Sequence, residues 1–61
     1  MTTIKAVRER EPWGKGAWYG EVIVDTNVVL ATDFQRTRRE AVAEALALAM
    51  VNGLSTDEVG L

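Results

Sequence analysis

Apolar, β-branched and aromatic residues are concentrated in two runs, from Ala17 to Val24 and from Val28 to Thr32, separated by three polar residues. Such runs, bounded by turn-forming residues, indicate two strands of one hairpin. Asp25-Thr26-Asn27 fits a three-residue connection, because asparagine tolerates the left-handed conformation that often ends such loops. The pattern therefore predicts antiparallel strands over residues 17–24 and 28–34.

The length of this connection fixes the register of the hairpin. A three-residue loop collects the larger apolar side chains on one face, whereas a two-residue loop shifts the pairing by one and scatters them across both faces. The predicted pairs are Val24 with Val28, Val22 with Leu30, Gly20 with Thr32, and Trp18 with Phe34. The predicted core face carries Trp18, Val22, Val24, Val28, Leu30 and Phe34.

Residues 2–9 show a shorter and imperfect alternation that turns polar at Arg8 and Glu9. This pattern predicts an edge strand, with a disordered segment as the alternative. Pro12, Gly14 and Gly16 then interrupt it, because proline lacks a backbone donor and glycine permits left-handed backbone. We predict a loop between this strand and the hairpin.

A helix is predicted over residues 37–52. Thr37 followed by Glu40 has the spacing of a capping box, and Gly53 is placed to stop the helix in the left-handed conformation. At about 100° per residue, one stripe of the helix faces the core side of the sheet. The stripe consists of Val42, Ala45, Leu46 and Ala49.

The last segment, residues 54–61, has a second capping pattern from Ser55 to Glu58 but too few residues for more than one turn. We expect a frayed tail, and the alternative is a tail that folds back over Leu48 and Val51. Taken together, residues 1–61 are predicted to form a single small α+β domain: a three-stranded antiparallel sheet packed on one C-terminal α-helix, in the order β-β-β-α.

Composition restricts the chemistry of this domain. The 61 residues contain no cysteine and no histidine, so disulfides, thiolate or imidazole metal ligation and histidine acid–base catalysis are excluded. A chain of this size has a small core and marginal stability. The longest apolar run, from Ala45 to Val51, is far shorter than a membrane span of about 20 residues, and we expect the protein in the cytoplasm.

Nothing in the sequence indicates an enzyme. The nine carboxylates mostly stand beside basic or polar residues, as solvated charges do, and none has an apolar setting that would shift its pKa. Gly14-Lys15-Gly16 lacks the remaining glycine, the Lys-Ser/Thr pair and the following helix of a phosphate-binding loop. We predict no catalytic residue, no cofactor and no metal site.

The second half of the helix carries more apolar side chains than one thin sheet can cover. Exposed apolar surface of this kind marks protein interfaces, and self-association is one way for a small chain to bury it. We therefore predict a protein-interaction module that forms a homo-oligomer. The predicted contact residues are Glu44, Ala47, Leu48, Met50 and Val51.

A nucleic-acid-binding domain is the alternative function. The net charge is −2, yet all seven basic residues lie between Lys5 and Arg39. Arginine interleaved with aromatic side chains is common on single-stranded nucleic-acid surfaces, although solvated rim charges account for the same pattern. The candidate residues are Arg8, Arg10, Trp13, Lys15, Arg36, Arg38 and Arg39.

A hairpin followed at once by Thr37-Arg38-Arg39-Glu40-Ala41 and an alanine-rich helix gives the chain a family resemblance. Residues 17–52 resemble the C-terminal ββα half of double-stranded-RNA-binding domains, HicB-like antitoxin domains, and the N-terminal arm-binding domains of phage-type integrases. The resemblance implies an accessory or regulatory protein of a phage or mobile element. Phe34-Gln35-Arg36 replaces the glycine-containing approach to the helix that the first two families carry.

Overall fold

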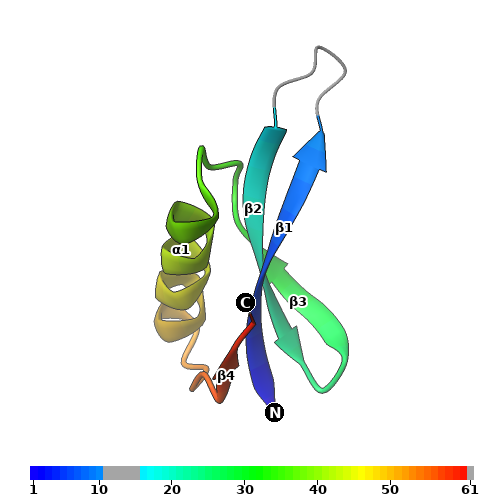
Figure 1. Cartoon of the computed structure of the whole chain (residues 1–61). Helices are drawn as coiled ribbons and strands as arrows, with labels where there is room; N and C mark the ends of the chain where they lie inside the picture. The colour runs from blue at the N-terminus through cyan, green and yellow to red at the C-terminus, as the bar shows by residue number, and fades with distance from the viewer. Residues whose placement is uncertain (11–15, 61) are drawn as a thin grey trace.

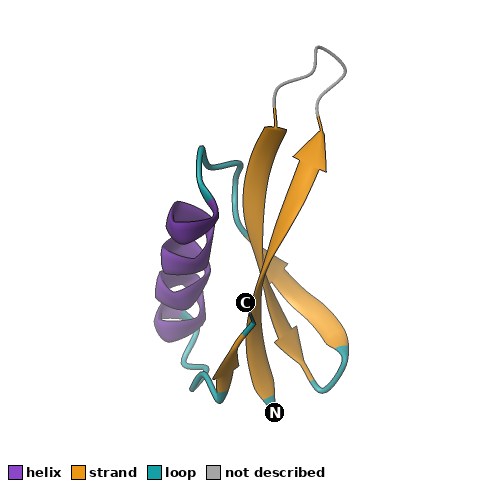
Figure 2. Ribbon diagram, viewed as in Figure 1, coloured by secondary structure: helices purple, strands orange, loops and turns teal. Residues whose placement is uncertain are grey.

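The protein is an α+β fold with one helix against one face of a four-stranded sheet. The computed structural model describes residues 1–10 and 16–60. The sheet order is β3-β2-β1-β4. α1 packs against one face of this sheet, and no described element packs against the opposite face of the sheet (Figures 1 and 2). The elements are β1 (Thr2–Arg10), β2 (Gly16–Val24), β3 (Asn27–Ala31), α1 (Arg38–Val51) and β4 (Glu58–Val59).

This architecture confirms the predicted β-β-β-α order and adds a short fourth strand. β1 pairs antiparallel with β2 from Thr2 opposite Val24 to Arg10 opposite Gly16, so the predicted N-terminal strand forms. Ile4 and Val22 face each other across this pair, and both are completely buried. They form the core with Ala45 and Ala49, flanked by the half-buried Leu30, Val42, Leu46 and Leu54.

The connection between β2 and β3 corrects the predicted register. Asp25 and Thr26 alone form the turn, with φ of 54° and 97°, and Val24 lies opposite Asn27. Left-handed residues at both positions suit a two-residue turn, whose twist matches that of the strands. A bulge then restores the pairing of Val22 with Leu30, as predicted, whereas the three-residue loop and the pair of Val24 with Val28 are wrong.

Two side chains leave the predicted core face, Val28 through this bulge and Phe34 through a separate shift after Ala31 that places Trp18 opposite Gln35. Val28 lies opposite Ile23, on the side of the sheet away from α1, and is 52% exposed. Phe34 packs its ring edge-to-face on Tyr19 with centroids 5.8 Å apart, and Trp18 bridges to Gln35 rather than to Phe34. The strand predicted to reach residue 34 ends at Ala31, and an isolated bridge follows it.

Thr37 caps the start of α1 and Gly53 follows its end, as predicted, but Glu40 bonds the Thr37 hydroxyl and not its backbone N–H as in a full capping box. Thr37 Oγ1 accepts a hydrogen bond of 3.2 Å from the backbone N–H of Glu40 and donates one of 3.0 Å to its carboxylate. Gly53 has the left-handed φ of 73° expected of the residue that ends a helix. No helix in residues 1–10 and 16–60 is long and apolar enough to cross a membrane.

The stripe of α1 that meets the sheet is narrower than predicted. Ala41, Ala45 and Ala49 are fully buried, whereas Val42 and Leu46 are only half-buried. Gly20 explains the shift, because a Cβ built there would lie 2.6 Å from Ala45 Cβ and against the Ala41 carbonyl. Small residues on both sides let the helix backbone approach β2 closely.

The C-terminal segment is ordered, and the predicted frayed tail is wrong. The backbone N–H of Thr2 donates to Asp57 Oδ2 over 2.7 Å, and the N–H of Asp57 donates to the Thr2 carbonyl over 2.9 Å. β4 then pairs parallel to β1, and Arg38 closes the end with a 2.9 Å hydrogen bond to the Gly60 carbonyl. The tail follows β1 and leaves Val51 85% exposed, so it does not fold back over that residue.

Candidate functional site

The two edges of the sheet differ in how they are protected. β4 covers Thr3 and Ile4 of β1, and the rest of β1 runs into the charged residues Arg8, Glu9 and Arg10. β3 forms the opposite edge, and no described strand pairs with its outer side. Its five residues include no charge and no proline, the features that usually protect an edge from pairing with other chains. β3 is therefore the edge that is open to another strand.

Apolar side chains are accessible along this edge. Val28 is 52% exposed and points away from α1, and Val29, the extra residue of the bulge, is 47% exposed. Val29 breaks the regular alternation of β3 at its centre. Bulges bend an edge, but this one leaves apolar side chains on both sides of the strand accessible.

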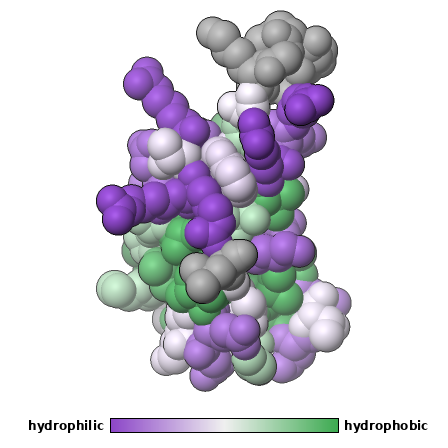
Figure 3. All heavy atoms as spheres, in the orientation of Figure 1, coloured by the Kyte–Doolittle hydropathy of each residue, from purple (hydrophilic) through white to green (hydrophobic). Residues whose placement is uncertain are grey.

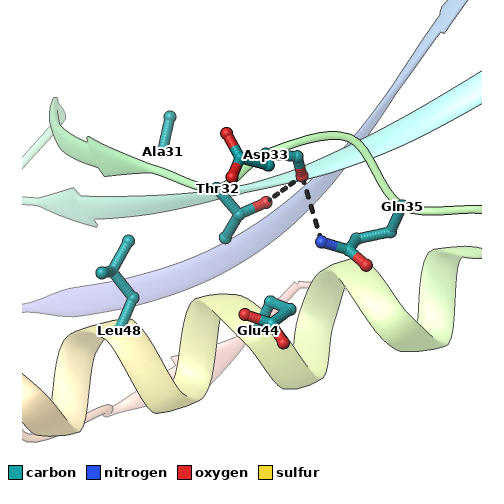
Figure 4. Close-up of a pocket in the computed structure, with 6 residues that line it drawn as sticks. All are labelled: Ala31, Thr32, Asp33, Gln35, Glu44 and Leu48. Carbon is teal, nitrogen blue, oxygen red and sulfur yellow. Dashed lines mark hydrogen bonds between the residues drawn. The ribbon is translucent and has the colours of Figure 1, made fainter.

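A groove lies between the end of β3 and α1. Figure 4 shows Ala31 and Thr32 on the strand side of it, with the Ala31 methyl pointing away from the helix, and on the other side Leu48 reaching up from the helix and Glu44 lying over it. Its volume is about 190 Å³. Pockets for drug-sized ligands measure about 300–1,000 Å³, so this groove suits one or two side chains of a partner instead. The residues that line it are Ala31, Thr32, Asp33, Gln35, Glu44 and Leu48.

The groove continues onto the adjacent side of α1. Glu44, Leu48 and Val51 are spaced four and three residues apart, so their side chains follow one another along one side of the helix. Leu48 is half-buried in the groove and Val51 is 85% exposed. We call this surface the β3 flank. It consists of Val28, Val29, Ala31, Glu44, Leu48 and Val51.

The structure thus divides the contact residues predicted from the sequence. Glu44, Leu48 and Val51 lie together on the β3 flank. Met50 is 77% exposed on the other side of α1, where it lines a second hollow with Leu46 and Leu54. Ala47 is exposed on the side of the helix away from the sheet. The strand β3 was predicted, but not as part of the contact surface, because its edge position depends on the order of the strands.

The sheet face away from α1 is a second apolar surface. The T-shaped pair of Tyr19 and Phe34 lies on it, beside Val7, which is opposite Tyr19 in β1. Ile23 and Val28 form the next apolar rung toward the turn. Lys5 and Glu21 lie opposite each other between these rungs. In the sequence, the alternation of Tyr19, Glu21 and Ile23 places these three residues on one face of the strand.

The predicted nucleic-acid residues fall into two groups, one on β1 and one around the start of α1, and a row of paired residues across the sheet connects them. Arg8 and Arg10 lie on the α1 side of β1, and Arg8 is opposite Trp18, which bridges to Gln35 just before Arg36. Hydrophilic side chains gather over this end of the molecule, around the helix start and the far ends of β1 and β2 (Figure 3).

Not every residue of that predicted set is free for nucleic acid. Arg38 is half-buried and donates to the Gly60 carbonyl, whereas Arg36 and Arg39 are exposed. Trp13 and Lys15 lie outside the described residues. The exposed arginines of the set form no ion pair with another described residue.

The single ion pair within the described residues lies at the opposite end. The Met1 ammonium donates to Asp25 Oδ1 over 2.6 Å, and both groups are exposed. This hydrogen bond and the attraction between the charges raise the pKa of the ammonium and lower the pKa of Asp25. Among residues 1–10 and 16–60, no three carboxylates are grouped as a metal site requires.

Comparisons with known proteins add no assignment. No protein-family model matches the chain, and neither the curated proteins nor the solved structures gave a match.

Proposed function

We propose that the protein is a non-enzymatic protein-interaction module and that the β3 flank is its contact surface. The observation that carries this proposal is the coincidence of an uncharged edge strand with exposed apolar helix residues on the same side of the molecule. Natural sheets usually protect such edges with charges, proline, bulges or short length, and β3 has only the bulge and the short length.

The energetics support the same reading. Full burial of a valine or leucine side chain is worth about 1.5–3 kcal/mol. Val28, Val29 and Val51 are each about half or more exposed, so a partner that covers them gains a substantial part of that free energy. The largest fully buried side chains are Ile4 and Val22, so the core is small and the free energy of unfolding of the isolated chain is expected to be low.

The test compares two substitutions on α1. Val51→Glu places a charge on the β3 flank, whereas Met50→Glu places one at a similarly exposed position on the other side of the helix. We expect affinity capture from nuclease-treated lysate to lose its bound protein with Val51→Glu and to keep it with Met50→Glu. Equal loss in both variants, or in neither, would remove the β3 flank from the proposal.

Self-association belongs to the same proposal, since a second copy of the chain is one protein partner. Sedimentation at tens of micromolar measures it directly, and a monomeric wild type would restrict the proposal to other proteins. The family resemblance supports an accessory or regulatory protein of a phage or mobile element as the setting.

Nucleic-acid binding is the second candidate function, favoured by the rung that joins Arg8, Trp18 and Gln35. Phosphate contacts release counterions, so binding by Arg8 and Arg10 must weaken steeply with salt. We expect Arg8→Gln to lower the salt dependence by about one unit of slope. Lys5→Gln is the matched control, because Lys5 lies on the opposite side of β1. Absence of any mobility shift with DNA or RNA at low salt would reject this function.

A further inference from the structure

We propose that the β3 flank takes up an extended segment of another protein as an added strand, and that this segment carries apolar residues and a lysine or arginine on one side. The inference rests on the proposed function and specifies its partner. It follows from the backbone of β3, the groove beside it, and the charges along the flank.

The backbone supplies the first argument. A strand that pairs with the outer side of β3 lies about 4.8 Å from it, and its successive side chains point to opposite faces of the sheet. Side chains on the α1 side then lie over the groove between Ala31 and Leu48. Alternate residues of the segment therefore face Leu48, beside the polar side chains of Thr32, Asp33, Gln35 and Glu44.

The charges supply the second argument. Asp33 and Glu44 line one end of the groove, and none of the described residues that line it is basic. A lysine or arginine two residues from the apolar position of the segment reaches this acidic end on the same side of the strand. Opposite charges on neighbouring strands attract, whereas a glutamate there is repelled.

The same charges argue against a second copy of the chain as the added strand. In a pair of two β3 strands, residues Asn27–Ala31 of one copy bring no basic side chain to the groove of the other, which has Asp33 and Glu44 at its end. Every charged residue from Asp25 to Asp33, and Glu44 beside the groove, is acidic. Self-pairing thus leaves the acidic end of the groove without a cation, whereas a basic segment from another protein neutralises it.

The probes that test this inference are short blocked peptides. In the first peptide, every second residue is threonine, and the residues between the threonines are two valines and one lysine. In an extended chain both valines and the lysine therefore lie on one side. A second peptide has glutamate in place of lysine. A third and a fourth have N-methyl groups on the backbone of alternate residues, on one edge or on the other.

We expect the lysine peptide to perturb the amide NMR signals of β3 and to bind at least about fivefold more tightly than the glutamate peptide. N-methylation of the edge that faces β3 should abolish binding, and N-methylation of the other edge should leave it unchanged. A protein with both Asp33→Asn and Glu44→Gln should keep its folded spectrum and bind the lysine and glutamate peptides equally.

Several outcomes would overturn strand addition. The peptide results that would do so are equal binding of the lysine and glutamate peptides by the wild type, equal effects of both N-methylation patterns, or no binding by any peptide at millimolar concentration. Perturbation of amide signals outside β3 and the groove, or a wild-type dimer that pairs through β3, would do so as well. If Val51→Glu still abolishes partner capture, the proposed function survives any of them. If that variant also has no effect, both proposals fall.

Discussion

Gly20 determines how closely α1 approaches the sheet. Its missing side chain leaves room for the Ala41 carbonyl and for Ala45 Cβ, which are rigid parts of the helix. Gly20→Ala should therefore force α1 away from β2 and lower the free energy of unfolding by about 1–3 kcal/mol. Urea denaturation measures the loss.

Gly16→Ala is the matched control for that substitution. A Cβ at Gly16 meets only the end of the Arg8 side chain, at 2.9 Å from Nε, and this flexible group moves aside at little cost. The two variants have the same chemical change in the same strand. Equal destabilisation would mean that the contact with the helix is unimportant.

Thr26 adopts a conformation that its side chain disfavours. Its φ of 97° suits glycine, and a β-branched residue there is strained. Thr26→Gly should stabilise the protein by about 1 kcal/mol, since two-residue turns prefer glycine at this second position. The denaturation midpoint should rise. An unchanged or lower midpoint would show that the turn stores no strain, and Thr3→Gly, within β1, should lower it in any case.

At the scale of elements, the tail acts as a clamp on β1. The Asp57 carboxylate accepts a hydrogen bond from the backbone N–H of Thr2, a residue that is only 7% exposed. Asp57→Ala should leave this donor without its partner and cost about 1–2 kcal/mol. Glu58→Ala, which removes a neighbouring exposed carboxylate, should cost less than about 0.5 kcal/mol. Unfolding of both variants in guanidinium measures the two losses of stability. Equal losses would mean that the tail does not hold β1 through Asp57.

Local signals in the sequence predicted most of the elements. The capping pattern at Thr37 and the glycine after the helix predicted the limits of α1, alternation located β1, and a run of aromatic and β-branched residues located β2. The turn was missed because Thr26 is an unusual residue for positive φ, so the polar triplet resembled a longer loop. β4 was missed because its pairing depends on β1, which lies more than fifty residues earlier.

Helical spacing also found half of the candidate site. It grouped Glu44, Leu48 and Val51 but could not separate Met50, since the position of the sheet decides which side of the helix faces β3. The contribution of β3 was invisible for a related reason. Whether a strand is central or at an edge depends on the strand order, which no single segment of the chain encodes.

At the scale of the whole molecule, a small core makes stability responsive to a partner. A ligand at ten times its dissociation constant adds about 1.4 kcal/mol to the free energy of unfolding. For a chain of this size, that gain corresponds to about 5–10 °C in Tm. We expect the lysine peptide to produce this rise in the wild type.

The same measurement with Val51→Glu provides the comparison. Because this variant loses apolar surface on the β3 flank, the peptide at the same concentration should raise its Tm by a smaller amount. Met50→Glu should respond like the wild type. An identical rise in all three proteins would place the peptide away from the flank.

The unequal edges of the sheet have a consequence for assembly. A ribbon of strands lengthens indefinitely only when each unit that joins presents a fresh free edge. Here one border is closed over part of its length by β4 and carries charges beyond it. Because no further chain can add at that closed border, copies of this protein should not join edge to edge in series, and no fibre of the protein should grow.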